Sequence, residues 1–150
     1  MIISDILRYK TSSGGSDRPG LVTIAPGDTV ADLVATLARH NVGALVVVDG
    51  DGGSVAGIAS ERDVVRRLAD HGNDLLAQPV SSIMTTTVAS CASTEGVDDV
   101  AGTMTERRIR HMPVIDDDRL VGIVSIGDVV SSRIRQLEHD RGQLEQYISS

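Results

Sequence analysis

The chain has 150 residues and a formal net charge of −7, and it contains two tyrosines but no phenylalanine or tryptophan. A chain of this length can bury roughly 70% of its unfolded surface, so it needs no disulfide or metal to stabilise a core. The acidic charge argues against nucleic acid or an acidic membrane as the main partner, and the scarcity of aromatic side chains excludes most modules that stack single-stranded bases.

The cellular compartment can also be inferred from composition. The single cysteine, Cys91, excludes an intramolecular disulfide and fits a reducing compartment. The N-terminus lacks the basic region and apolar run of a secretory signal, and no apolar run approaches the roughly 20 residues that span a bilayer. We therefore expect a cytoplasmic protein with no membrane contact, in which Cys91 is a core thiol rather than a nucleophile.

The sequence repeats itself. Segments in the two halves match at a common offset of 67, namely 25–30 with 92–97 and 42–49 with 109–116. Residues 4–7 match 81–84 at an offset of 77, which places about ten extra residues of the first copy within 10–20. A tandem duplication follows, which we divide into a first domain at 1–73 and a second at 74–150.

Each copy is expected to form a strand, a helix, two strands and a helix, which makes the fold class α/β (α+β). In the first copy the elements are expected at 21–24, 29–41, 44–48, 55–59 and 60–70, followed by a polar linker at 70–78. In the second copy they are expected at 88–91, 97–107, 112–115, 120–124 and from 125 to about 148, the last helix being interrupted or frayed near Gly142. The two repeats should pack through their sheets.

Two segments are open to more than one interpretation. Residues 10–20 are rich in glycine and serine, so they form either a linker or, because a strand follows directly, a lid. Apolar residues on the last helix recur at spacings of 3 and 7, and this stripe packs either on a partner subunit or on the same domain. Its members are Ile134, Leu137, Leu144 and Ile148.

A short motif where a strand meets a helix occurs in both copies, as Ser60 with Asp63 and as Ser125 with Asp128. The offset between the two motifs is 65, so the first copy carries two extra residues in the glycine-rich turn at 49–54. Serine before a helix and aspartate three residues later are typical of an N-terminal cap. The same place can bind phosphate through unpaired N–H groups, and a carboxylate there can accept hydrogen bonds from ribose hydroxyls.

The two copies resemble a tandem pair of CBS domains, also called a Bateman module. The resemblance is carried by 28–30, 42–49 and 57–65 in the first copy and by 107–116 and 122–130 in the second. It covers about residues 3 to 140, which leaves no catalytic domain, so the chain looks like a stand-alone CBS-pair protein. It implies two pseudo-symmetric β-α-β-β-α repeats and a cleft between them for adenosine ligands.

The resemblance also implies two sets of ligand-binding residues. One set is Ser125, Ile126, Gly127 and Asp128 with Ile109, Arg110, His111, Met112, Pro113, Val22, Thr23, Val42 and Gly43. The mirror set is Ser60, Arg62 and Asp63 with Met84, Thr85, Thr87, Val88, Val42 and Ile109. Arg62 adds a cation to the first corner, whereas Ile126 and Gly127 are expected to leave the second corner neutral. A basic cluster at 107–111 is either a solvated helix end or a source of positive charge for the second corner.

We therefore expect a regulatory module that binds AMP, ADP, ATP or NAD(H) and signals by a conformational change. A homodimer and an effector protein of unknown identity are the expected partners. The four histidines have no ligand spacing and no activated nucleophile is evident, so neither a metal site nor catalysis is expected. The alternatives are a nucleotide-processing enzyme that uses Asp63 or Asp128, and a protein-interaction module whose pockets no longer bind ligand.

Overall fold

The computed structural model describes residues 1–13, 21–50 and 53–149, with the side chains of 11–13 also outside the description. The elements of its first half are α1 (Ile3–Ser13), β1 (Thr23–Ile24), α2 (Val30–His40), β2 (Ala44–Asp49), β3 (Ser54–Ser60) and α3 (Glu61–His71). After two short 3-10 helices (Gly72–Ala77 and Val80–Ser82) come α4 (Val97–Arg107), β4 (His111–Asp116), β5 (Arg119–Ser125) and α5 (Ile126–Ser149). The mixed α/β class is confirmed.

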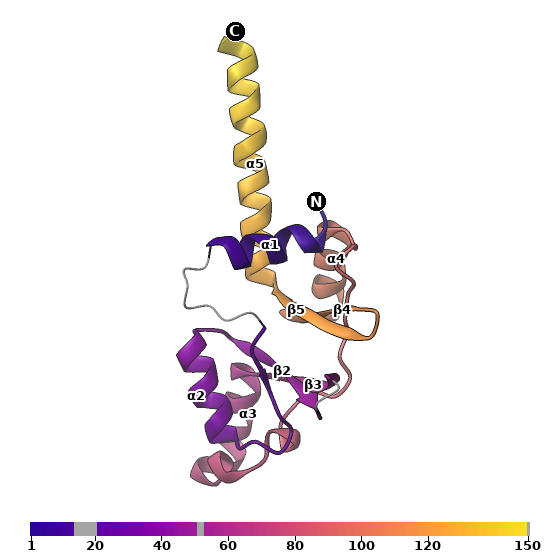
Figure 1. Cartoon of the computed structure of the whole chain (residues 1–150). Helices are drawn as coiled ribbons and strands as arrows, with labels where there is room; N and C mark the ends of the chain where they lie inside the picture. The colour runs from indigo at the N-terminus through magenta and orange to yellow at the C-terminus, as the bar shows by residue number, and fades with distance from the viewer. Residues whose placement is uncertain (14–20, 51–52, 150) are drawn as a thin grey trace.

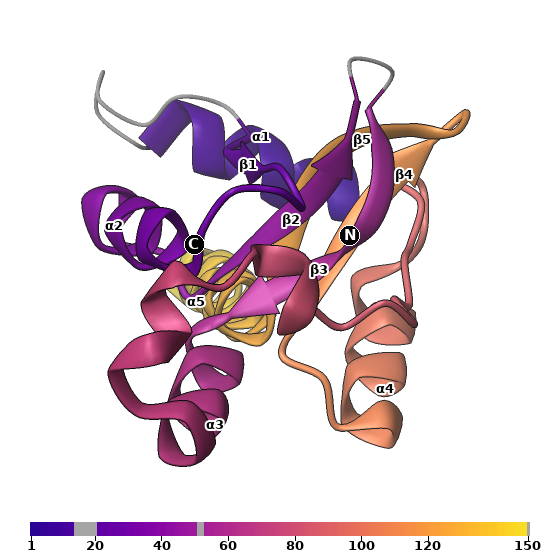
Figure 2. The ribbon, with the colours of Figure 1, turned by 90° about the horizontal axis from the view of Figure 1, so that it is seen from below.

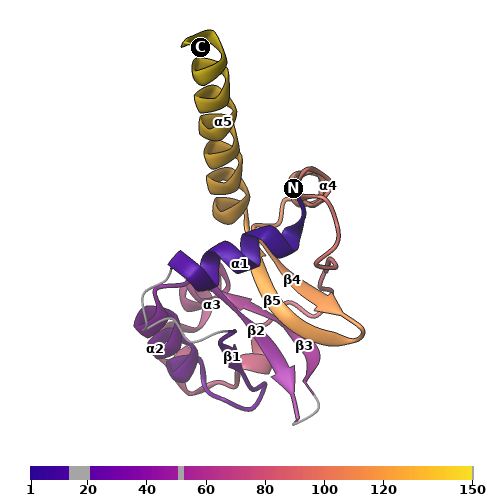
Figure 3. The ribbon, with the colours of Figure 1, turned by 45° about the horizontal axis from the view of Figure 1, so that its top comes forward.

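Two antiparallel hairpins, β2–β3 and β4–β5, lie side by side, and β3 contacts β5 (Figures 2 and 3). Each hairpin has one register shift, between Val47 and Val48 in the first and between Val114 and Ile115 in the second. These positions differ by the repeat offset of 67. The hairpin loops also differ as predicted, since Asp49 pairs with Ser54 but Asp116 pairs with Arg119. The internal repeat is therefore confirmed in three dimensions.

The strand expected at 88–91 does not form. Only Cys91 bridges in parallel to Val114, with the Cys91 N–H donating to the Pro113 carbonyl at 3.0 Å. The next rung of a parallel ladder would need the N–H of residue 113 to donate toward Ala89, and proline has no N–H. The prediction was wrong because it ignored Pro113; in the first copy Val46 holds that position and pairs with Thr23 of β1.

The two hydrophobic cores exchange segments. Ile3 and Ile6 of α1 are buried in the core of the second half, among residues of α4, β4 and β5. Conversely, Leu75 and Val80, which follow α3, are buried in the core of the first half. The linker predicted as polar at 70–78 therefore contains a fully buried leucine. The domain boundary at residue 73 describes the sequence repeat and stays a prediction.

The N-terminal segment is more helical than expected. No helix was predicted before residue 21, yet α1 runs to Ser13 and takes in the first residues of the expected loop at 10–20. Acidic Asp5 in its first turn and Lys10 in its last turn suit the helix dipole, and Ile3 and Ile6 bury one face. Residues 14–20 lie outside the described residues, so the lid hypothesis is not tested.

α5 is continuous to Ser149 and projects away from the hairpins (Figure 1). The expected interruption at Gly142 is absent. A single exposed glycine weakens a helix by about 1 kcal/mol without ending it, and the Arg141–Glu145 ion pair, 3.0 Å, spans this position. The residues of the apolar stripe are 51–81% exposed, so the described part of the same domain does not bury them. No helix in the described part of the chain is long and apolar enough to cross a membrane.

Candidate functional site

The first corner, Ser60 with Asp63, lies where β3 ends and α3 begins. Asp63 N–H donates to Ser60 Oγ at 3.2 Å, and Asp63 Oδ2 accepts from the Ser60 N–H at 2.9 Å and from the Ser60 hydroxyl at 3.0 Å. This reciprocal arrangement is a capping box, so the capping interpretation is confirmed for this corner.

The second corner, Ser125 with Asp128, repeats this geometry where β5 meets α5. Asp128 N–H donates to Ser125 Oγ at 3.0 Å, and Asp128 Oδ2 accepts from Ser125 N–H at 2.9 Å. In both corners the cap uses Oδ2, and Oδ1 has no hydrogen-bond partner among the described residues. Capping therefore leaves one carboxylate oxygen in each corner able to accept from a ligand hydroxyl.

The corners are tied to the loops that precede β2 and β4. Glu61 N–H, the first of α3, donates to the Gly43 carbonyl at 3.0 Å. Ile126 N–H, the first of α5, donates to the Arg110 carbonyl at 2.8 Å. These pairs occupy equivalent positions in the repeat. Arg110 lies at the second corner, for which it was predicted, whereas Gly43 was predicted for the second corner and contacts the first.

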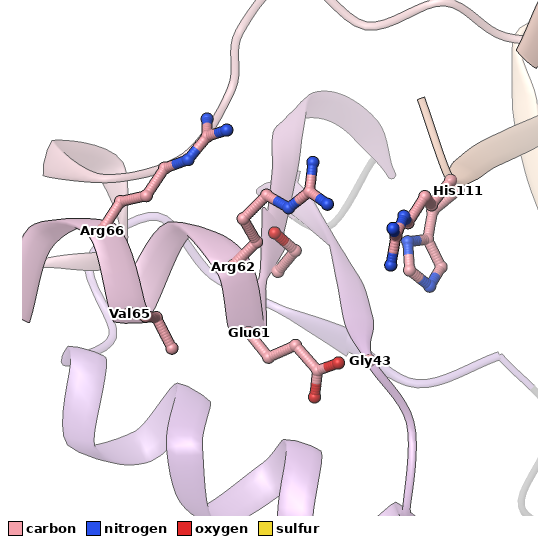
Figure 4. A pocket seen from close by; sticks show the side chains of 8 residues that line it. Gly43, Glu61, Arg62, Val65, Arg66 and His111 are labelled. Atoms are coloured by element: carbon pink, nitrogen blue, oxygen red, sulfur yellow. The ribbon is translucent and has the colours of Figure 1, made fainter. Parts of the chain in front are cut away.

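A pocket of about 570 Å³ opens beside the first corner (Figure 4). Arg62 and Arg66 rise from α3 on one side, and His111 lies on the other side. The complete lining is Gly43, Ser60, Glu61, Arg62, Val65, Arg66, Arg110 and His111. We call it the basic pocket, because it gathers three guanidinium groups, none with an ion pair among the described residues, in an otherwise acidic protein.

The basic pocket combines residues that the sequence assigned to different sites. Arg62 was predicted for the first corner, and Arg110 and His111 were predicted for the second. Arg66 was not predicted, although its position one helical turn after Arg62 on the same face of α3 is a signal that sequence reasoning could have used. An arrangement of this kind can bind a phosphate or pyrophosphate through charge-assisted hydrogen bonds.

His111 lies between the two corners. A Cβ atom on Gly43 would lie 3.4 Å from His111 Nε2 and 3.5 Å from Glu61 Oε1, which are ordinary contact distances, so the two copies lie close together here. Burial lowers the pKa of His111, whereas the carboxylates of Asp128 and Glu61 act in the opposite direction. The imidazole is therefore mainly neutral at pH 7.

The second corner contains a cation of its own, whereas Ile126 and Gly127 had predicted that it would have none. Lys10 of α1 places its ammonium 3.0 Å from Asp128 Oδ2 and 3.0 Å from the Ile123 carbonyl oxygen. Sequence reasoning missed this residue because it compared the two corners and not the segments that precede the copies. The offset of 77 pairs Lys10 with Thr87, a residue that was predicted for the first corner, so it could have revealed Lys10.

The other predicted residues differ in how far they are buried. Met112, which is 1% exposed, lies in the second core, and Pro113 is also buried, so neither side chain is open to a ligand. Thr85 pairs with Ile58 on the open edge of β3, with N–H to O distances of 2.9 and 3.0 Å. The remaining predicted residues are half-buried or exposed, namely Val22, Thr23, Val42, Met84, Thr87, Val88, Ile109, Ile126 and Gly127.

Neither metal binding nor thiol chemistry gains support. Among residues 1–13, 21–50 and 53–149, no group of three or more His, Cys, Asp or Glu side chains could hold a metal ion. Cys91 is 4% exposed, and desolvation together with Glu95 and Asp116 raises the pKa of its thiol to about 11. Its placement in the core is confirmed.

Comparison with known proteins identifies the relatives of this chain. The family model described as "CBS domain" matches residues 17–70 and 80–135. The mitochondrial CBS domain-containing protein CBSX3 of Arabidopsis thaliana is 37% identical over 149 residues, which cover 97% of this chain and 71% of that protein.

Solved structures agree with this match. A protein with CBS domains from Burkholderia ambifaria, for which a role in signal transduction is proposed, is 37% identical with a TM-score of 0.80, over 90% of this chain and 95% of that one. The CBS domain pair of protein MJ0100, in complex with 5′-methylthioadenosine and S-adenosyl-L-methionine, is 28% identical with a TM-score of 0.72. The match covers 92% of this chain and 98% of that one.

Proposed function

Because the chain belongs to the CBS-domain family and carries two CBS domains in tandem, we propose that it is a non-catalytic sensor of phosphate-bearing adenosine compounds. AMP, ADP, ATP and NAD(H) are the candidate ligands. The ligand binds at the Ser–Asp corners in the cleft between the repeats and changes how the two copies pack. The complex of protein MJ0100 with two adenosine compounds supports the adenosine part of the ligand.

One observation carries the proposal. Each corner aspartate caps its helix with Oδ2 and keeps Oδ1 without a partner among the described residues, beside a helix N-terminus. A ribose offers two adjacent hydroxyl donors for such a carboxylate, and a helix N-terminus favours phosphate. The basic pocket next to the first corner adds three guanidinium groups for one or more phosphates.

The proposal extends to partners and location. A homodimer and an effector protein that senses the packing change remain the proposed partners. A sensor without a catalytic centre acts through another protein. A cytosolic location also remains a proposal, and the mitochondrial assignment belongs to the Arabidopsis relative alone.

Thermal unfolding in the presence of a ligand panel tests the proposal. Adenosine, AMP, ADP, ATP and NAD are each added in excess, with GMP as the control for the base. A ligand at 100 times its Kd stabilises the folded state by about 2.7 kcal/mol, so the melting temperature should rise by several degrees for at least one phosphate-bearing adenosine compound.

Three outcomes would contradict the proposal. Melting temperatures that stay the same with every compound would favour the interaction module without a working pocket. Turnover of ATP or NAD that disappears in Asp128→Ala would favour the enzyme. A rise with GMP equal to that with AMP would remove the adenosine specificity.

A further inference from the structure

Lys10 is held at the second corner by the packing of its helix. α1 lies across the end of β5 and the start of α5 (Figure 3), and Ile3 and Ile6 fix it in the second core. The Lys10 ammonium lies 3.0 Å from both Asp128 Oδ2 and the Ile123 carbonyl oxygen, and its side chain is only 32% exposed. The cation is therefore part of the corner and not a free surface charge.

The contact leaves the corner able to bind a ligand. An ammonium group has three N–H donors, and Lys10 uses two of them for Asp128 and the Ile123 carbonyl. Asp128 uses Oδ2 for both Lys10 and Ser125, while Oδ1 has no partner among the described residues. A ribose hydroxyl can thus donate to Oδ1 while the third donor of Lys10 faces an anionic group of the same ligand.

The first corner has no equivalent cation from the corresponding segment. Leu7 lies against Gly122, where a Cβ atom would be 2.8 Å from Leu7 Cδ2, and Met84 lies against Gly57 in the same way. This pair of contacts shows that the offset of 77 holds in space, so Thr87 corresponds to Lys10. The structure thus contains one corner whose aspartate is paired with a lysine and one whose aspartate is not.

We propose that Lys10 is a specificity-determining residue of the second corner, which selects adenosine compounds that carry phosphate over the uncharged nucleoside. The inference rests on the proposed function and adds a residue from α1 to it. Lys10 offsets the charge of Asp128, so a phosphate near this corner meets a cation instead of an unpaired carboxylate.

Binding of AMP and adenosine, measured by calorimetry, tests the role of Lys10. All proteins carry Asp63→Ala, which disables the first corner, so the titration reports on the second. Lys10→Met keeps most of the side-chain length without the charge, and we expect AMP to bind at least about tenfold more weakly while adenosine changes less than about twofold. Lys10→Arg should restore most of the preference for AMP, because it restores a cation.

Arg8→Met serves as the matched control. It removes one positive charge from the same helix, at a side chain that is 75% exposed and pairs with Asp5 at 2.9 Å. The ratio of the two dissociation constants should stay as in the Asp63→Ala parent. A lower folded fraction raises the apparent dissociation constants of AMP and adenosine by the same factor, so a loss of stability in Lys10→Met cannot imitate the expected change in this ratio.

The outcomes separate the two proposals. If the parent binds AMP and Lys10→Met keeps the same ratio of AMP to adenosine affinity, the role of Lys10 is refuted and the sensor function stands. Tighter AMP binding by Lys10→Met would show that Lys10 obstructs the corner and would likewise refute the inference. If neither the parent nor the wild-type protein binds any adenosine compound, the sensor function itself fails.

Discussion

At the scale of single residues, Asp63 and Asp128 combine a structural and a ligand-binding role in one side chain. Capping explains why Ser and Asp stand at these positions, and it occupies only Oδ2 of each carboxylate. The sequence alone cannot separate the two roles, because both require the same residues at the same spacing. The difference lies in the oxygen that the cap leaves open, which needs three-dimensional geometry.

His111 makes stability depend on pH in a predictable direction. Burial lowers its pKa from 6.5, so the unfolded chain takes up a proton at a higher pH than the folded protein does. Below about pH 6.5 the unfolded state therefore binds more protons than the folded state. As the pH decreases through this range, the free energy of unfolding falls by up to about 1.4 kcal/mol per pH unit. Asp128, Glu61, Lys10 and Arg110 are the charged groups around it.

Urea unfolding at pH 7.5 and pH 5.5 checks this prediction. We expect His111→Gln to lose less stability than the wild type between the two pH values, since glutamine does not titrate. The other three histidines are present in both proteins and cancel in the difference. Equal losses in the two proteins would show that His111 is not held neutral by burial.

At the scale of elements, much of the fold could be predicted from local patterns. The helix at Val30–His40 and both hairpins follow from apolar periodicity, and their repeat at a fixed offset strengthens each assignment. The errors come from effects beyond the local pattern. Pro113 removes a donor from a neighbouring strand position, and Leu75 is apolar within a polar segment because it fills the core of the first half.

The parts of the candidate site that lie within local motifs could be predicted from the sequence, and the parts that depend on tertiary contacts could not. The corners and their loops lie within conspicuous local motifs, whereas the basic pocket joins α3 of one copy to β4 of the other. Lys10 reaches Asp128 across 118 positions of the sequence. Contacts of this kind depend on how α1 packs on the second half, which apolar spacing does not specify.

The exposed face of α5 is the surface through which we expect the proposed homodimer to form. The residues of this face recur at alternating spacings of three and four, as the a and d positions of a two-stranded coiled coil do. All are apolar except Arg141, which occupies one of these positions. The series is Val130, Ile134, Leu137, Arg141, Leu144 and Ile148. We expect the double substitution Leu137→Glu and Leu144→Glu to halve the molecular mass seen in sedimentation equilibrium.

The melting of the folded domains should change little, because these leucines are more than 60% exposed. Gln146→Glu is the matched control, since it adds a negative charge to the exposed part of the same helix outside this series. A dimer that persists in the double variant would show that the two subunits associate through another surface.

At the scale of the whole molecule, the exchange of core segments links the two copies. α1 stabilises the second core and supplies Lys10 to the second corner, while the segment around Leu75 and Val80 stabilises the first core. Gly43 and His111 approach closely between the halves. A ligand that contacts both copies can therefore alter their packing, which is the change that an effector would sense.

Calorimetric titration of AMP into the wild type, Asp128→Ala and Asp63→Ala tests the central claim most directly. The account predicts saturable binding to the wild type, and each substitution should weaken one corner by about 10- to 150-fold through the loss of charge-assisted hydrogen bonds. Lost capping should lower stability by about 1 kcal/mol, which urea unfolding monitors separately. A variant that still binds AMP with the stoichiometry of the wild type, and with affinities within about twofold of it at every site, would contradict the role of the substituted corner.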